Sequence, residues 1–365
     1  MTETSLGASP RVVTRVFSPK SATAEQWKAF HCYIRLRAVE EDPGEPVVTD
    51  AVRQHDMQIK WPLFEAHRVL ALIDGEIVGS LAMWTRRRGT PDYKAHARHI
   101  TADAGVLKSR RRQGVGTALL GELAAFMRER EHTTAMLSAR VGDGTAFLAS
   151  IGAVEKHRMV ENRLDLSRVN GSILRAWEAH GDQVEGLAWE IHAGRVPLDR
   201  YEALIPQLTV MLNSMPLGDL DIPPLRFNLV QIKAWYAEMD ARGGDHTMVL
   251  LNAGTEVVAV SEAVWASEFP DRAFQNLTAV TPSWRGRGLA KAVKARLLRA
   301  VCERRPDVRL AITSNANVNA AILAINTQLG FVPHRDVRTF QITRGAIEAT
   351  LARSPKPWRS RSPPA

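Results

Sequence analysis

The chain has 365 residues, 45% of them hydrophobic, which is enough for two globular units with cores of their own. It carries 48 Lys and Arg against 39 Asp and Glu, and the resulting charge of +9 favours an anionic partner such as nucleic acid, a membrane surface or a phosphorylated small molecule. Two widely separated cysteines, Cys32 and Cys302, exclude a disulfide framework and a cysteine metal cluster, and they predict buried free thiols.

The N-terminal sequence "MTETSLGASP" lacks the basic-then-apolar pattern of a secretion signal. No window reaches the roughly 18 apolar residues that a membrane helix requires. We therefore expect a soluble, cytoplasmic protein with no metal and no membrane partner.

Two long stretches of the chain share one order of predicted elements. Each opens with two apolar runs joined by a tight turn, at Asp74-Gly75 in "HRVLALIDGEIVGSLAMW" and around Gly254 in "TMVLLNAGTEVVAVSEAVW". This pattern predicts a β-hairpin in each copy. A further strand follows, ending at Val106 in the first copy and at Val280 in the second, and it leads into a turn rich in Arg and Gly.

An amphipathic helix follows each Arg/Gly turn, then a short strand, a second helix, a glycine turn and a last strand. The glycine turns are Ile151-Gly152 and Leu329-Gly330. The apolar stripes of the two amphipathic helices are Val115, Leu119, Leu123 and Phe126 in the first copy, and Leu289, Val293, Leu297 and Val301 in the second.

The repeat predicts two α/β units with a junction between them. We expect a flexible N-terminus (1–10), a first domain (11–168), a linker (169–190) without chemistry of its own, a second domain (191–350) and a disordered tail (351–365) rich in Pro, Ser and Arg.

Each Arg/Gly turn has the properties of an anion site. Gly288 and the small residue Ala290 let the backbone approach a ligand closely, and the helix that starts there presents free N–H groups and its positive dipole end. The alternative is that such a turn only solves a packing problem. The dinucleotide pattern G-x-G-x-x-G and the phosphate loop G-x-x-x-x-G-K-[ST] are absent from both turns, which share R-x-x-G-x-[GA] instead.

This arrangement resembles the GNAT superfamily of N-acetyltransferases in its tandem form, whose loop has the pattern Q/R-x-x-G-x-G/A. The chain offers "RRQGVG" from Arg111 and "RGRGLA" from Arg285, and "NANVNAAILAINTQLGF" resembles the family's later helix, opened by Asn319 and closed by Gly330-Phe331. Tandem members, of which mycothiol synthase is one, are typical of actinobacteria. The resemblance implies two tandem GNAT domains, each a mixed, mostly antiparallel sheet flanked by helices.

The resemblance also implies acetyl-CoA as the cofactor, held mainly by backbone groups at a strand end and at the loop. The implied cofactor-binding residues are Val280, Thr281, Pro282, Arg285, Gly286, Arg287, Gly288, Leu289, Ala290 and Asn319 in the second copy, and Val106, Leu107, Lys108, Arg111, Arg112, Gln113, Gly114, Val115, Gly116 and Thr117 in the first.

The catalytic groups depart from the family's usual pattern. Many members place a Tyr five residues before the closing Phe, where this chain has Asn326 and, in the first copy, Leu148. Many also place a Glu on the strand before the loop, where this chain has Ile100 and Phe274.

Acidic candidates for the base remain beside the second copy. Glu262 lies in the apolar strand "AVSEAVW"; if it faces inward, a desolvated carboxylate accepts a proton more readily, and if it faces outward it is only a solvated side chain. Asp219 and Asp221 in "GDLD" are further candidates, or caps of a following helix. Asp103 and His99 are the first copy's counterparts.

We therefore expect an acetyl-CoA-dependent N-acetyltransferase that acts on a small-molecule amine or a peptide N-terminus, in specialised metabolism or self-resistance, with the second copy as the catalytic one. The missing Tyr and Glu keep a non-catalytic acetyl-CoA-binding or scaffold protein as the alternative. Nucleic-acid binding is a weaker interpretation, because no aromatic platform interleaves the basic residues. The sequence leaves the acceptor and the oligomeric state open.

Overall fold

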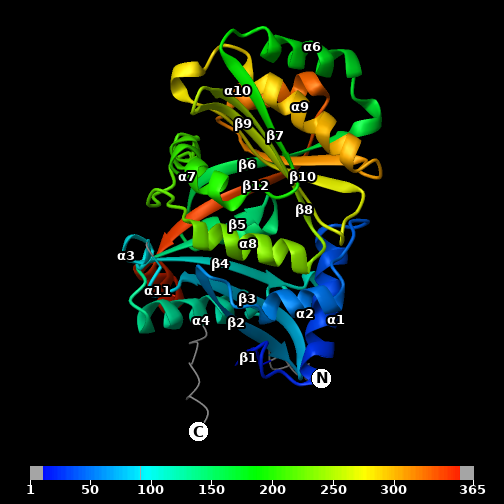
Figure 1. Cartoon of the computed structure of the whole chain (residues 1–365). Coiled ribbons are helices and arrows are strands. Elements are labelled where there is room, and N and C mark those ends of the chain that lie inside the picture. The colour runs from blue at the N-terminus through cyan, green and yellow to red at the C-terminus, as the bar shows by residue number, and fades with distance from the viewer. Residues whose placement is uncertain (1–10, 91, 354–365) are drawn as a thin grey trace, which may run out of the picture. The chain divides into compact units, whose positions relative to one another are not determined.

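The computed structural model describes residues 11–90 and 92–353 of the chain (Figure 1). The expected flexible N-terminus and residues 354–365 of the expected tail lie outside the described residues, whereas residues 351–353 end a helix. The chain forms two compact units: the first comprises residues up to Glu155 together with those from Thr339 onward, and the second comprises Lys156–Arg338.

The first unit has a sheet in the order β1-β2-β3-β4-β5, followed by the end of β12. β4 and β5 are parallel, and the pairs β1–β2, β2–β3 and β3–β4 are antiparallel. Its elements are β1 (Val13–Val16), α1 (Ala24–Glu41), α2 (Asp50–Gln58), β2 (Phe64–Ile73), β3 (Glu76–Arg86), α3 (Tyr93–His96), β4 (His99–Val106), the 3-10 turn η1 (Lys108–Arg110), α4 (Val115–Glu129), β5 (Thr134–Arg140), α5 (Asp143–Ser150) and, from the C-terminal segment, β12 (Val332–Thr343) and α11 (Arg344–Arg353).

The second unit has a sheet in the order β12-β6-β11-β10-β9-β8-β7, in which β10 and β11 are parallel. Its elements are β6 (Val154–Asp165), η2 (Leu166–Arg168), α6 (Gly171–Asp182), β7 (Leu187–Ala193), α7 (Leu198–Asn213), α8 (Leu229–Ala241), β8 (Asp245–Ala253), β9 (Glu256–Trp265), β10 (Arg272–Val280), η3 (Pro282–Trp284), α9 (Leu289–Arg304), β11 (Leu310–Ala316) and α10 (Ala320–Leu329).

Helices cover both faces of the sheet in each unit. In the first unit α4 and α11 pack on one face and α1 on the other. In the second unit α9 packs on one face, while α7 and α8 pack on the other. This two-faced arrangement confirms the fold class that the sequence predicted, a mixed and mostly antiparallel sheet flanked by helices in each of two units.

Local sequence signals located the elements well. The turn between β2 and β3 has positive φ at Asp74 (51°) and Gly75 (85°), the geometry of a two-residue hairpin turn. β4 and β10 end at Val106 and Val280, as predicted. The predicted stripe residues of α4 and α9 are buried, apart from the partly buried Phe126.

The last strand of each copy lies away from its own copy. In a simple tandem repeat β6 would lie beside β5, but it pairs antiparallel with β11, from Asp165↔Leu310 to Met159↔Ala316. The end of β12 takes the place beside β5, where Ser138 Oγ lies 3.0 Å from Thr339 Oγ1.

The expected domain limits therefore do not coincide with the compact units. The stretch expected to be a linker, 169–190, is part of the second unit, because its helix α6 packs against α9 and it leads into β7. One expectation about the cysteines was wrong: both are free thiols, but Cys32 is exposed and Cys302 is only partly buried. Within residues 11–90 and 92–353, no helix has the length and apolar character needed to cross a membrane.

The C-terminal helix α11 should stabilise the first unit (Figure 1, red, beside α4). Ile347 is fully buried in the core with α4, so we expect Ile347→Ala to lower the free energy of unfolding by about 3 kcal/mol, the usual cost of such a cavity. Hydrogen exchange should accelerate in α4 and β5, with α9 unchanged. Val332→Ala, at a residue 61% exposed, is the control. Faster exchange in α9 alone would contradict this assignment of α11.

Candidate functional site

In the second unit, two parallel strands separate and leave backbone groups free. β10 and β11 pair from Arg272↔Leu310 to Gln275↔Thr313, and the ladder ends there. We call the residues beyond this point, 276–280 of β10 and 314–316 of β11, the second wedge, because they no longer pair with each other although each strand still pairs with its other neighbour. Thr281 N–H bonds Val258 O at 2.9 Å, so the alternation of strand groups turns the N–H of Val280 toward β11.

A β-bulge lies at the closed end of the second wedge. Gln275 pairs with Ala263 and Leu277 with Glu262, which leaves Asn276 as an extra residue in β10. β4 keeps an unbroken register with β3 from Thr101 to Val106. The first wedge, residues 103–106 and 138–140 beyond the pair Ala102↔Leu137, therefore lacks the bulge of the second.

Both Arg/Gly turns place positive-φ residues immediately before a helix. Gly286 (79°) and Gly288 (75°) occupy this region in the second turn, and Arg112 (62°) and Gly114 (84°) do so in the first. A left-handed conformation is costly for a residue with a side chain, so Arg112 makes the first turn the more strained one.

Both helices begin at a glycine. Gly288 is the N-cap of α9 and Gly114 that of α4, and in the described part of the chain no side-chain hydrogen bond caps either helix. The N–H groups at the very start of each helix therefore lack a side-chain partner, although Lys291 N already bonds Gly288 O at 3.0 Å, and the helix dipole favours an anion there. Arg285 and Arg111 adopt the same pose, with Nε donating to Val280 O at 3.2 Å and to Val106 O at 3.3 Å.

A histidine that the sequence did not indicate lies at the second turn. His180 of α6 has its Nε2 2.9 Å from Arg287 O, and a Cβ on Gly288 would lie 2.8 Å from the same nitrogen. The expectation that 169–190 carries no chemistry therefore overlooked this residue. Sequence gave no signal for it, because α6 and the turn are more than a hundred residues apart.

Glu262 faces inward, toward α7 and α8. Its Oε2 lies 3.2 Å from Nε2 of the fully buried His246, and its side chain is 17% exposed. Tyr236 OH accepts a hydrogen bond from Val196 N at 2.9 Å and lies 3.3 Å from His246 Nδ1. If the phenol donates to Nδ1, the imidazole proton sits on Nε2 and is donated to Glu262.

The two tyrosines near Glu262 remain neutral hydrogen-bonding groups at neutral pH. Burial and then the Glu262 carboxylate raise the pKa of Tyr201. Burial, opposed in part by the bond from Val196, raises the pKa of Tyr236 to about 12. Glu262 pairs with Leu277, the first residue beyond the bulge, so it lies one strand, or about 5 Å, from the closed end of the second wedge.

Other sequence candidates lie apart from this group. Asp219 and Asp221 are exposed, and Asp219 N–H bonds Lys156 O at 2.9 Å. Neither caps a helix, because α8 begins with Asn228 as N-cap and a capping box to Gln231. Asn319 is the N-cap of α10, where its Oδ1 accepts from Ile322 N at 3.3 Å.

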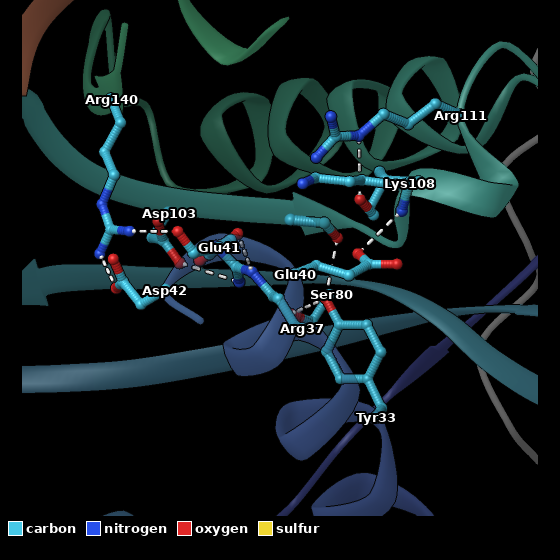
Figure 2. Close-up of polar contacts among 12 residues, drawn as sticks. Tyr33, Arg37, Glu40, Glu41, Asp42, Ser80, Asp103, Lys108, Arg111 and Arg140 are labelled. Atoms are coloured by element: carbon cyan, nitrogen blue, oxygen red, sulfur yellow. Dashed lines mark hydrogen bonds and ion pairs between the residues drawn. The ribbon is translucent and has the colours of Figure 1, made fainter. Parts of the chain in front are cut away.

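The first wedge is bridged by the end of α1 (Figure 2). Arg37 lies so close to β4 that a Cβ on Gly105 would overlap its guanidinium, and Arg37 Nη1 is 3.5 Å from Asp103. Glu40 Oε2 accepts from Lys108 N at 2.9 Å. From the other strand, Arg140 of β5 donates to Glu41 O at 3.1 Å.

Charge and burial fix this bridge. Burial by itself would lower the pKa of Arg37, but Asp103, Tyr33 and Glu41 together outweigh it and raise the pKa, so the guanidinium stays charged. Burial raises the pKa of Tyr33, whose OH donates to Gly105 O at 2.9 Å beside Ser80 (Figure 2). The corresponding end of α7 is apolar instead, with Leu208 and Met211 buried.

The second wedge and its turn fit acetyl-CoA. The uncapped first turn of α9, with exposed Arg285 and Arg287 beside it, suits a pyrophosphate. The unpaired edge of β10 suits the amides of an extended pantetheine arm, which can bond it as an added strand does.

Comparison with known proteins finds a family match within the first unit and similar folds over most of the chain. Residues 32–147, within the first unit, match the acetyltransferase (GNAT) family. No protein of curated function matches the sequence.

Two solved structures share the fold over almost the whole chain. A tandem GNAT protein from the clavulanic acid biosynthesis pathway, solved without acetyl-CoA, is 19% identical, with a TM-score of 0.68 over 92% of this chain and 99% of its own. A GCN5-related N-acetyltransferase from Sphaerobacter thermophilus is 15% identical, with a TM-score of 0.64 over 91% of this chain and 96% of its own. Family match and fold together identify the chain as an acyltransferase whose residues 32–147 match the acetyltransferase (GNAT) family.

Proposed function

We propose that the second unit transfers the acetyl group of acetyl-CoA to an amine of a small molecule or a peptide N-terminus. The observation that carries the proposal is the meeting, within one unit, of an open wedge, an uncapped helix start and an inward-facing carboxylate next to the wedge. The residues proposed to hold the cofactor are Val280, Thr281, Pro282 and the loop from Arg285 to Ala290.

Glu262 is the proposed proton acceptor. An amine acceptor is an ammonium ion at neutral pH and must lose a proton before it can attack a carbonyl carbon. A carboxylate on the α7/α8 face can take that proton, and His246 keeps it oriented through the bond between Nε2 and Oε2. Asp219, exposed in the loop before α8, is the less favoured alternative.

The first unit is proposed to serve mainly structure. α1 ties its last turn to both strands of the first wedge, through Arg37 and Glu40 to the β4 side and through Arg140 to β5. The N–H of Lys108 is engaged by Glu40, whereas the second copy has Pro282, which has no N–H to engage. A cofactor entering the first wedge would have to displace these contacts.

The setting is proposed to be specialised metabolism or self-resistance. The tandem GNAT protein from the clavulanic acid biosynthesis pathway supports this setting. At 19% identity, the similarity between the two chains is one of fold.

Release of free CoA from acetyl-CoA tests the proposal. We expect one or more members of a panel of small primary amines, amino sugars and peptides with free N-termini to accelerate thiol release, with an acetylated product in the mass spectrum. Mass spectrometry of ligands that copurify with the protein would direct the choice of amines. Tight acetyl-CoA binding without acceptor-dependent thiol release would instead support a non-catalytic acetyl-CoA-binding protein.

A further inference from the structure

A lysine is completely buried beside the closed end of the second wedge. Lys294 of α9 is 0% exposed, and its Nζ donates to Gln275 Oε1 at 2.6 Å. Gln275 is the last residue of β10 that pairs with β11 before the strands separate. The ammonium group is therefore held at the point where the second wedge begins.

The contacts of Gln275 fix the orientation of its amide. Its Nε2 donates to Ser261 Oγ at 3.0 Å and to Thr278 Oγ1 at 3.2 Å, so Oε1 is the atom left to face Lys294. Thr278 lies in the second wedge itself. Within the described residues, Gln275 is the hydrogen-bond partner of Lys294, which leaves two of the three ammonium protons without an acceptor.

No carboxylate among residues 11–90 and 92–353 compensates this buried charge. Lys294 lies 4.7 Å from the ring centroid of Phe331, and β9 and β10 present the neutral Ser261 and Gln275. The carboxylate that α6 brings to α9, Glu178, lies 3.4 Å from Arg296 and 3.1 Å from Arg299 instead. A buried cation without a counter-ion is costly, which points to a function.

The position of Lys294 along the second wedge suits a group that meets the thioester. The helix start that would hold the pyrophosphate lies six residues earlier at Gly288, about 9 Å along the helix axis. α9 runs back along β10 from its open end, and Lys294 meets β10 at Gln275, about 16 Å from Val280 along the strand. An extended arm held at the loop and along β10 would reach toward Lys294 with its reactive end.

The family's usual proton donor, a Tyr on the helix that follows β11, is missing. Asn326 stands where a Tyr would, and its Nδ2 donates to Asn315 Oδ1 of β11 at 2.7 Å. An amide does not release a proton at neutral pH, so this pair cannot act as an acid. Lys294, by contrast, is a buried titratable group at this end of the second wedge.

We infer that Lys294 protonates the sulfur of CoA as it departs, an inference that rests on the proposed acetyl transfer in the second unit. The acceptor nitrogen, which has given its ammonium proton to Glu262, forms a bond to the carbonyl carbon while the C–S bond breaks and its electron pair goes to sulfur. The surplus proton of the new amide nitrogen passes to water. An N–H proton of Lys294 moves to that sulfur, giving the free thiol of CoA and an uncharged Lys294 side chain. Lys294 regains a proton from water after the thiol leaves.

Acidity and placement agree with this role. Burial lowers the pKa of Lys294 to about 7, below the roughly 8.5 of an ordinary thiol, so the transfer to a thiolate is downhill. Lys294 lies on the α9 face of the sheet, and Glu262 lies on the α7/α8 face. A thioester between them has the proton acceptor on one side and the proton donor on the other.

Lys294→Met tests the inference, because Met keeps the length of the side chain but has no proton to give. We expect kcat for CoA release to fall about 10²-fold, with little change in KM for acetyl-CoA. In the wild-type protein kcat should decline as the pH rises above about 7, where Lys294 loses its proton, and the variant should lack this decline. Lys233→Met, exposed on α8, is the control.

Binding of CoA and of acetyl-CoA to Lys294→Met tests the placement of Lys294 at the sulfur without any turnover. The thiol of free CoA can accept or share the Lys294 proton, whereas the thioester sulfur is a poor acceptor. Calorimetry should show CoA binding to the variant about 10-fold more weakly, with acetyl-CoA affinity within roughly twofold of the wild type.

The outcomes separate this inference from the proposed function. Normal kcat with the pH decline retained in Lys294→Met would overturn the role of Lys294 and leave acetyl transfer intact. Absence of thiol release from the wild type, with any amine or with water, would remove the proposed function. In that case an unchanged ratio of CoA to acetyl-CoA affinity in the variant would overturn the placement of Lys294 at the sulfur, and a changed ratio would support it.

Discussion

Ala290→Glu should lower the affinity for acetyl-CoA about 10³-fold and remove acetyl transfer, whereas Gly116→Glu should leave both nearly unchanged. Both residues are in the first turn of a helix that follows an Arg/Gly turn, α9 and α4. A glutamate there satisfies the helix dipole, so each helix should remain folded. At Ala290 its carboxylate would occupy and repel the site proposed for the pyrophosphate, a loss of several kcal/mol.

Ala290 is a better position for this substitution than Gly288. Gly288→Glu would force a side chain into a positive φ of 75° and against His180, so it would disturb the turn whether or not a cofactor binds. Gly116 has no such obstacle, since a Cβ there meets the ring of Phe147 only at 3.4 Å. Calorimetric stoichiometry and steady-state rates give the readout. A dead Gly116→Glu enzyme with an active Ala290→Glu enzyme would reverse the roles assigned to the two units.

Glu262→Gln should lower kcat by 10²-fold or more, with the affinity for acetyl-CoA nearly unchanged. The amide oxygen of Gln can still accept the proton of His246 Nε2, so the side chain should stay in place, but it cannot take a proton from an ammonium acceptor. The loop of the second unit is untouched by this change. Steady-state kinetics over a range of pH, with the best amine of the panel, is the measurement.

Glu256→Gln is the control for this prediction, because Glu256 opens the same strand and is exposed. A wild-type kcat in Glu262→Gln at every pH would show that Glu262 takes no part in the reaction. Asp219 would then be the next residue to replace. A ratio of wild-type to Glu262→Gln kcat that shrinks as the pH rises and the amine acceptor becomes neutral would strengthen the assignment of Glu262 as proton acceptor, because the decline expected from Lys294 is common to both enzymes.

The sequence by itself determined the local elements of both copies. Hairpin turns at Asp74-Gly75 and Gly254, strand ends at Val106 and Val280 and the apolar stripes of α4 and α9 all depend on neighbours within a few residues. Turn residues and hydrophobic periodicity reflect such short-range preferences directly, and the structure confirms these elements.

Contacts between distant segments were decided only by the tertiary structure. A strand with the right alternation of side chains can pair with any suitable sheet edge. The sequences of β6 and β12 therefore do not indicate that β6 pairs with β11 of the second copy or that the end of β12 lies beside β5 of the first. The same holds for the end of α1 over the first wedge and for His180 at the loop, since each is joined to its partner across many tens of residues.

The burial of single polar side chains is a further feature that the sequence could not show. Nothing in the sequence indicated that Lys294 is buried, because a long charged side chain on a helix normally reaches water. In the tertiary structure Lys294 packs against Gln275 and Phe331 and does not reach water. The tertiary structure likewise joins Glu262 to His246, because only the pairing of β8 with β9 determines which side chains meet on the inner face of the sheet.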